Sequence, residues 1–225
     1  MDQLDRPIWH ALCGRQSNFA RGEGGAKRFR PDVSPFIALD PEDSSGLDAV
    51  RWLLDPEEEV LFCQRDEVPI PGGCKLVEAN RGVQMVAEHF EPTVSSTNII
   101  ALGEGDVPAM LELARLSEPG PFRDRTCELS QFWGIKDSSG RLLAMAGERL
   151  RISGRSELSG VCTHPEVRGR GFAKSLSRHV ASDIVRRGEA PFLHVYADNH
   201  GAIALYEQLG FRRRCFVEAV AIRLA

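Results

Sequence analysis

Val161-Cys-Thr-His-Pro-Glu-Val-Arg-Gly-Arg-Gly-Phe-Ala-Lys-Ser175 is the stretch that decides the fold. An apolar run typical of a strand leads into a glycine-rich turn, and apolar residues at 173, 176, 180 and 184 follow the spacing of one helix face. The first amides of a helix have no intrahelical acceptor, and the helix dipole adds partial positive charge there. Arg168, Arg170 and Lys174 contribute full charges. The segment therefore predicts an anion site at a helix N-terminus that suits a pyrophosphate.

Three phosphate-binding patterns compete for this turn. A Walker A loop requires Gly-x-x-x-x-Gly-Lys-Ser/Thr, and the chain has the final Lys174-Ser175 but lacks both glycines. A dinucleotide fingerprint requires Gly-x-Gly-x-x-Gly, and Lys174 replaces its third glycine. The pattern Arg/Gln-x-x-Gly-x-Gly/Ala is matched in full by Arg168, Gly171 and Ala173. The turn therefore fits the third pattern best, and a phosphate-loop nucleoside triphosphatase is a less favoured alternative function.

A second motif follows in register with the first. Asn199, a residue that caps helices, precedes the sequence Ala202-Ile-Ala-Leu-Tyr-Glu-Gln-Leu-Gly-Phe211. Together the two motifs resemble the GCN5-related N-acetyltransferases (the GNAT superfamily), and residues 159–173 are similar to its FR47-like branch. The resemblance covers about residues 98–225. It implies an α/β fold, a mixed α+β sheet whose central strands splay apart, preceded by a smaller α+β region.

The resemblance also implies a bound acetyl-coenzyme A. Strands 158–163 and 192–196 would part and admit the thioester between them, and Asn199 would bind the pantetheine arm. The backbone of the first strand would pair with the same arm through Val161, Cys162 and Thr163. Backbone amides would hold the pyrophosphate at Arg168, Gly169, Arg170, Gly171, Phe172, Ala173 and Lys174.

The implied reaction is direct attack of a neutral amine on the thioester in a ternary complex. A backbone N–H near 161–163 would polarise the thioester carbonyl. Tyr206, at the tyrosine position of the family, is the candidate general acid for the departing thiolate. Glu157 is the candidate general base and Glu148 the second choice, while many relatives of the fold use no direct base. Cys162 is expected in the core rather than as a nucleophile.

Composition limits the other function classes. The chain has 225 residues, with 28 Lys and Arg against 32 Asp and Glu, a net charge of −4. This balance predicts no nucleic-acid partner, and the lack of a long apolar run or a signal-like N-terminus predicts a cytoplasmic protein with no membrane partner. The six cysteines form no Cys-x-x-Cys and the six histidines no His-Glu-x-x-His, so no metal site is predicted.

The N-terminal region, residues 1–97, carries no motif with an assignable chemistry. Its pattern is α+β, and we expect either a degenerate copy of the same lobe or a lid, separated from the acetyltransferase domain (98–225) at 91–97. It holds 10 basic and 17 acidic residues, whereas residues 98–225 hold 18 basic and 15 acidic residues. The acidic region hints at a cationic acceptor.

The sequence thus predicts an acetyl-coenzyme A-dependent N-acetyltransferase that acts on a primary amine. The amine belongs to a small molecule or a peptide, and its identity is not readable because it depends on variable loops. The alternative from another class is an acyl-coenzyme A sensor or regulatory module with little catalysis. For the oligomeric state, the sequence leaves a homodimer as one alternative.

Overall fold

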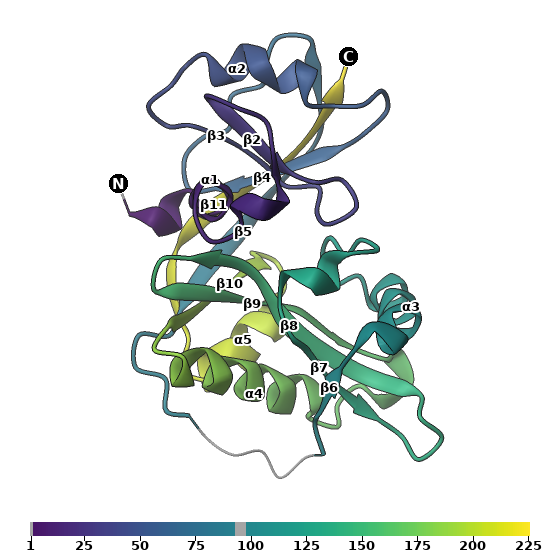
Figure 1. Cartoon of the computed structure of the whole chain (residues 1–225). Coiled ribbons are helices and arrows are strands. Elements are labelled where there is room, and N and C mark those ends of the chain that lie inside the picture. Colours follow the sequence, from purple (N-terminus) through teal and green to yellow (C-terminus); the bar gives the residue numbers. More distant parts are fainter. Residues whose placement is uncertain (1, 93–97) are drawn as a thin grey trace.

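The computed structural model describes residues 2–92 and 98–225, and in that part of the chain it places five α-helices and eleven strands (Figure 1). The helices are α1 (Pro7–Cys13), α2 (Gly46–Ala49), α3 (Val107–Ser117), α4 (Phe172–Arg186) and α5 (His200–Gln208). The strands are β1 (Ala20–Arg21), β2 (Ala26–Phe29), β3 (Ile37–Leu39), β4 (Val60–Gln64), β5 (Cys74–Val86), β6 (Ile100–Leu102), β7 (Phe132–Lys136), β8 (Leu142–Ile152), β9 (Arg155–Thr163), β10 (Ala190–Tyr196) and β11 (Arg212–Leu224). The mixed α/β class expected from the sequence is confirmed.

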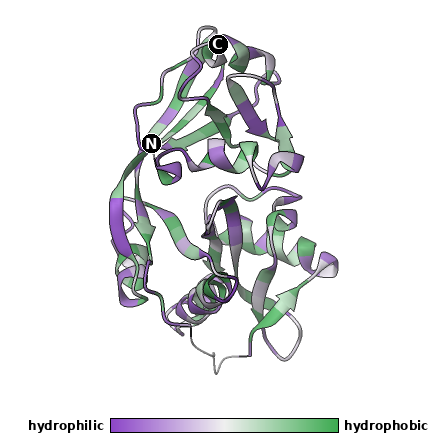
Figure 2. Cartoon of the chain, turned by 60° about the vertical axis from the view of Figure 1, so that its left-hand side comes forward, coloured by the Kyte–Doolittle hydropathy of each residue, from purple (hydrophilic) through white to green (hydrophobic). Residues whose placement is uncertain are grey.

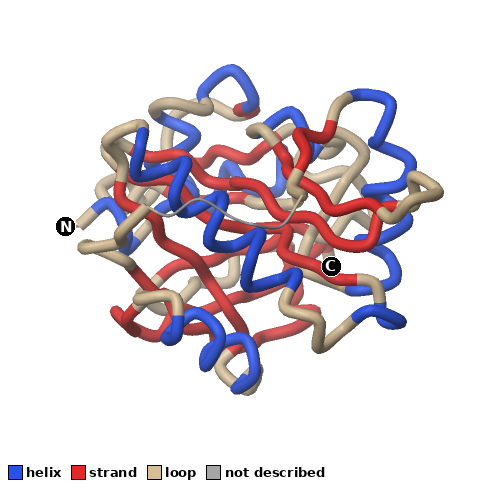
Figure 3. The backbone as a smooth tube through the Cα atoms, turned by 90° about the horizontal axis from the view of Figure 1, so that it is seen from below, coloured by secondary structure: helices blue, strands red, loops and turns tan. Residues whose placement is uncertain are grey.

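One large sheet spans both halves of the sequence. Its eight strands lie in the order β4-β11-β5-β10-β9-β8-β7-β6, and a separate small sheet has the order β1-β2-β3. In Figure 3 strands cross the middle of the molecule and helices lie around them. Strand β5 comes from the N-terminal region, yet it pairs with β10 on one side and with β11 on the other.

The boundary expected near residue 97 therefore does not divide the sheet. Residues 93–97 of the expected linker lie outside the described part of the chain. Strands β4 and β5 precede it and are built into the same sheet as β6 to β11. A second core, with Leu12, Phe29 and Phe36, packs against Phe192 of β10 and Val217 of β11. Removing the N-terminal region would expose this apolar surface to water.

Helices cover both faces of the sheet because their apolar residues recur at helical spacing, and Figure 2 shows bands of both hydropathy classes on them. Helix α4 buries Leu176, Val180 and Ile184 in one cluster with residues of β8, β9 and α5. Helix α3 buries Met110 and Leu113 in a different cluster, against Met145 and Cys162 among others. Successive strand residues point to opposite faces, which explains the two clusters.

The central strands part where the sequence predicted. Strands β9 and β10 pair in parallel only from Ala190↔Arg155 to Phe192↔Glu157. Beyond these pairs β10 continues beside β5, through Tyr196 opposite Gly82, while β9 stays with β8. Each strand is held by its outer neighbour, so their facing edges separate and leave a gap that another chain-like molecule can enter.

A glycine bulge sets the course of β9 beside this gap. Two β9 residues, Gly160 and Val161, stand opposite Ala146 alone, because Met145 pairs with Cys162 and Gly147 with Ser159. Gly160 has φ +62°, and a Cβ added there would lie 2.8 Å from the ring of Phe132. Both the backbone angle and the close ring require glycine.

We predict that Gly160→Ala lowers the free energy of unfolding by about 1–3 kcal/mol, because alanine adds backbone strain and a clash with Phe132. Urea unfolding measures the change. Gly105→Ala is the matched control, since Gly105 has open space around it and no positive φ. A stable Gly160→Ala variant would contradict the role given to the bulge.

Candidate active site

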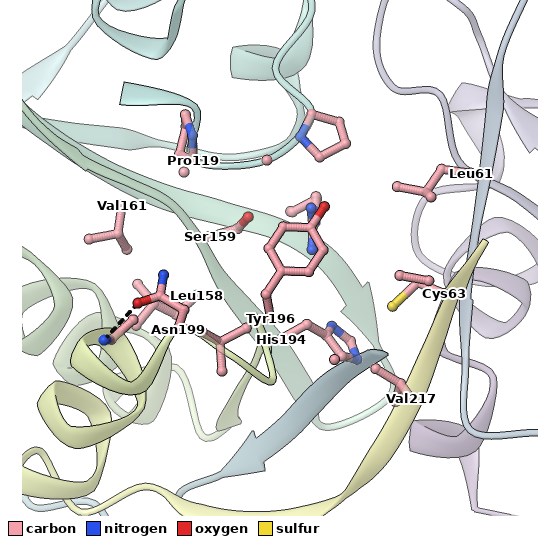
Figure 4. Close-up of a pocket in the computed structure, with 18 of the residues that line it drawn as sticks. Leu61, Cys63, Pro119, Leu158, Ser159, Val161, His194, Tyr196, Asn199 and Val217 are labelled. Atoms are coloured by element: carbon pink, nitrogen blue, oxygen red, sulfur yellow. Dashed lines mark hydrogen bonds between the residues drawn. The ribbon is translucent and has the colours of Figure 1, made fainter. Parts of the chain in front are cut away.

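An inner pocket opens between the parted strands (Figure 4). It is bounded by β9, by β10 and α5, by the loop that follows α3, and by residues of the N-terminal region. Figure 4 shows Ser159 and Val161 on one side, Leu61 and Cys63 on the other, and Tyr196 projecting between them. The residues that line it are Phe36, Leu61, Cys63, Gly82, Glu118, Pro119, Gly120, Pro121, Arg149, Leu158, Ser159, Gly160, Val161, His194, Val195, Tyr196, Asn199, Ala202, Tyr206, Val217 and Ala219.

An anion groove continues from the inner pocket to the N-terminus of α4. Val161 lines both, and the other residues of the groove are Ser117, Cys162, Thr163, Val167, Arg168, Gly169, Gly171, Phe172, Ala173, Lys174 and Leu205. The structure thus brings together every predicted cofactor-binding residue except Arg170, which stands exposed beside Phe172, and Asn199, which lines the inner pocket.

The turn before α4 is shaped for an anion. Gly169 and Gly171 have φ of +80° and +81°, and Gly171 is an N-cap without a side-chain hydrogen bond to the helix. The first amides of α4 are therefore free to bind a ligand. Deeper in the groove, the hydroxyl of Thr163 is buried with no hydrogen-bond partner among the described residues. Such a group costs free energy unless a ligand satisfies it.

Buried Glu157 lies at the point where β9 and β10 part. Its carboxylate accepts two hydrogen bonds from Arg149, at 3.0 and 2.7 Å, and one from the backbone N–H of Leu150 at 3.2 Å. His194 Nδ1 lies 2.7 Å from the same carboxylate. Burial raises the pKa of Glu157, but Arg149 and His194 outweigh that effect and lower it to about 2. The carboxylate thus stays ionised in the folded protein.

The general-base role expected of Glu157 does not fit this geometry. Its side chain has no exposed surface and does not line the inner pocket, whereas Arg149 and His194 do. A carboxylate with a pKa of about 2 is also a weak proton acceptor. Glu148, the second choice, is buried and paired with Arg187 at 2.7 Å. Both carboxylates form ion pairs: Arg149 reaches Glu157 across the β8–β9 hairpin, 8 residues away, and Arg187 reaches Glu148 from 39 residues away.

His194 has no nitrogen left for catalysis. The side chain of Gln84 is oriented by Arg214, which donates to its oxygen at 2.9 Å, so its nitrogen faces both the Leu4 carbonyl at 2.7 Å and His194 Nε2 at 3.0 Å. His194 Nε2 is then an acceptor and Nδ1 the donor to Glu157. His194 is thus a structural histidine of the sheet, hydrogen-bonded through both ring nitrogens.

Two tyrosines line the inner pocket. Tyr206, the predicted acid, is buried against Phe211, and desolvation raises the pKa of its phenol to about 12. Tyr196 is half-exposed, and burial raises its phenol pKa as well. Sequence reasoning missed Tyr196, because the signal was only a tyrosine at the end of a predicted strand, next to the motif that begins at Asn199.

Two further predicted residues are placed by local structure. Asn199 caps α5 through its oxygen, which accepts from Ala202 N at 3.1 Å, and it also lines the inner pocket. Its amide NH₂ remains available for a ligand. The thiol of Cys162 is buried in the α3 core, and desolvation raises its pKa to about 12. This environment makes Cys162 unreactive, in agreement with the core role expected.

An outer groove leads from the inner pocket to the surface. It is lined by Pro35, Glu59, Val60, Leu61, Glu78, Asn80, Leu111, Ala114, Arg115, Glu118, Gly120, Pro121, Phe122, Arg123, Asp124, Tyr196, Ala219 and Ala221. Leu61, Glu118 and Tyr196 belong to both cavities. The N-terminal region forms one wall of this groove, and the loop after α3 forms the other.

Within residues 2–92 and 98–225, no group of three or more His, Cys, Asp or Glu side chains is arranged to hold a metal ion. A search of the same residues finds no helix with the length and hydropathy of a membrane span.

Comparisons with known proteins find similarity to acetyltransferases. The family model described as FR47-like protein matches residues 133–220. A crystal structure of a putative acetyltransferase of the GNAT family from Novosphingobium aromaticivorans is 40% identical, covers 100% of both chains and has a TM-score of 0.94. The [Ribosomal protein bS18]-alanine N-acetyltransferase of Escherichia coli K12 is 27% identical over 118 residues, 50% of this chain and 79% of that protein. A GCN5-related N-acetyltransferase from Kribbella flavida shares the fold, at 17% identity, a TM-score of 0.62 and coverage of 99% and 95%.

We predict that Glu157→Gln lowers the free energy of unfolding at pH 7 by about 3 kcal/mol, because it leaves the buried charge of Arg149 uncompensated. The folded-state pKa of Glu157 lies below the ordinary glutamate value of 4.5, so its stabilisation is present at neutral pH. It is lost as pH falls from about 4.5 toward 2.

Urea unfolding at a series of pH values checks this prediction. Glu91→Gln is the control, since Glu91 is exposed. A Glu157→Gln variant with wild-type stability at pH 7, or a deficit that does not shrink in acid, would contradict it.

Proposed function

Because this chain belongs to the GNAT family of acetyltransferases, in its FR47-like branch, we propose that it transfers the acetyl group of acetyl-coenzyme A to a primary amine in a ternary complex. The observation that carries this proposal is the continuous path from the α4 N-terminus, along the free edge of β9, to the two tyrosines of the inner pocket. This path matches a long ligand with an anion at one end and a reactive carbonyl at the other.

The residues present fit acetyl-coenzyme A. The amides of 169–174, together with Arg168, would hold its pyrophosphate, and the edge of β9 at 161–163 would pair with the pantetheine arm as an added strand does. The orphaned hydroxyl of Thr163 and the free amide of Asn199 supply two further contacts. When bound, acetyl-coenzyme A supplies the thioester carbonyl that the amine attacks.

The reaction needs two proton transfers, one to the departing sulfur and one from the attacking amine. The new N–C bond forms as the C–S bond breaks, and the Tyr206 phenol donates a proton to the departing sulfur. The high pKa of Tyr206 keeps this proton in place until a strong base appears beside it. Backbone N–H groups on the free edge of β9 polarise the carbonyl.

The proton of the attacking amine leaves through water in the outer groove. Glu157 and Glu148 are buried in ion pairs, and both nitrogens of His194 are hydrogen-bonded, so none of the three accepts it directly. Activity should therefore rise with pH as the free amine fraction of the acceptor rises. In this scheme Glu157 is a positioning residue that holds β9, β10 and Arg149.

We predict that Arg168→Glu/Gly171→Asp weakens acetyl-coenzyme A binding by roughly 100-fold, because it places two negative charges against the pyrophosphate. Calorimetric titration measures the affinity. Arg21→Glu/Gly24→Asp is the matched control, since Arg21 is exposed and Gly24 has φ +62° with open space around it. Wild-type affinity in the first variant would sink this assignment of the pyrophosphate site.

We also predict that Tyr206→Phe lowers kcat by about 100-fold or more while the affinity for acetyl-coenzyme A changes less than about twofold, because only the proton donor is removed. Steady-state kinetics with an amine panel and calorimetry give the two quantities. Tyr196→Phe is the comparison, since Tyr196 lines the same pocket. If kcat falls further in Tyr196→Phe than in Tyr206→Phe, Tyr206 is not the general acid. A protein that binds acetyl-coenzyme A but acetylates no amine would instead support the alternative function, an acyl-coenzyme A sensor.

A further inference from the structure

Arg149 is held rigidly at the wall of the inner pocket. Its Nε and Nη2 donate to the two oxygens of Glu157 at 3.0 and 2.7 Å. Its guanidinium lies over the ring of Phe36, 4.6 Å from the centroid, and its side chain is only 11% exposed. A planar guanidinium fixed along one edge and covered on one face has a single orientation.

One nitrogen of Arg149 is left for a ligand. The two bonds to Glu157 use Nε and Nη2, and Nη1 has no hydrogen-bond partner within residues 2–92 and 98–225. Nη1 lies 4.0 Å from the position of a Cβ added at Gly120, in the loop after α3 that also lines the inner pocket. The two N–H groups of Nη1 thus face the cavity where the acceptor must meet the thioester.

The charge of Arg149 is already balanced. Glu157, whose carboxylate stays ionised, is its bidentate partner. Glu118 adds a further negative charge at the rim of the same pocket. A ligand with a full negative charge would therefore gain little from Arg149, whereas a neutral carbonyl oxygen can accept from Nη1 without meeting net repulsion.

We propose that Arg149 binds a carbonyl oxygen of the acceptor, and that the preferred acceptor is an α-amino amide: a primary amine whose neighbouring carbon carries an amide carbonyl. This inference rests on the proposed function and adds the substrate class. The amine reaches the thioester past Tyr196, the carbonyl oxygen accepts from Nη1, and the rest of the acceptor extends into the outer groove. A peptide N-terminus has this chemistry, and a lysine side chain does not.

The test compares two acceptors of nearly equal shape, L-alaninamide and 3-methyl-2-aminobutane, in which an isopropyl group replaces the amide. The ratio of their kcat/KM values is measured for the wild type and for Arg149→Lys, which keeps the positive charge beside Glu157 but removes Nη1. We expect Arg149→Lys to lower this ratio by about tenfold or more, the value of a hydrogen bond to a charged group. Differences in amine basicity cancel in the comparison between enzymes.

Controls separate binding from folding. Arg151→Lys lies two residues along β8 and lines neither cavity, so its ratio should equal that of the wild type. Arg149→Lys should still fold and keep its affinity for acetyl-coenzyme A, with a lower melting temperature because lysine cannot make both bonds to Glu157. If this variant does not fold, Arg149→Gln/Glu157→Gln removes both charges together and should lower the ratio in the same way.

Three results would overturn the inference. They are an unchanged ratio in a folded Arg149 variant, a loss of acetyl-coenzyme A affinity that accounts for the whole effect, and a wild type that acetylates polyamines or lysine side chains but not alaninamide. A wild type that binds acetyl-coenzyme A and acetylates none of these amines contradicts the proposed function itself, and the inference falls with it.

Discussion

The buried carboxylate of Glu157 is the constraint on which the rest of the site depends. Glu157 is the last β9 residue that pairs with β10, and it accepts hydrogen bonds from Arg149 and Leu150 of β8 and from His194 of β10. One side chain thus ties three strands together at the point where two of them separate. Beyond it, the edges of β9 and β10 have no mutual hydrogen bonds, and a ligand can supply them.

The N-terminal region completes this arrangement instead of forming an independent unit. Strand β5 holds β10 away from β9 on its far side, and Gln84 of β5 orients His194. Phe36 covers Arg149, and Leu61 and Cys63 close the inner pocket. The same residues that stabilise the sheet therefore also line the inner pocket, on the side where we propose that the acceptor binds.

Local motifs predicted the turn before α4 and the cap of α5 at Asn199, since both are determined by neighbours in sequence. The family resemblance that these motifs carry also predicted that β9 and β10 part. The acceptor side could not be predicted in this way. The placement of β5 depends on pairing with β11, about 140 residues later, and Glu157 is buried against His194 of β10, 37 residues later. Such long-range partners leave no periodic signal in the chain.

A crystal structure of the chain with bound coenzyme A tests the central claim most directly. We expect the pyrophosphate on the amides of residues 169–174 and the pantetheine arm along the free edge of β9, with its sulfur beside Tyr206 and the bonds of Glu157 intact. Coenzyme A bound elsewhere, or a β9 and β10 that pair beyond Glu157 and close the gap, would contradict the account.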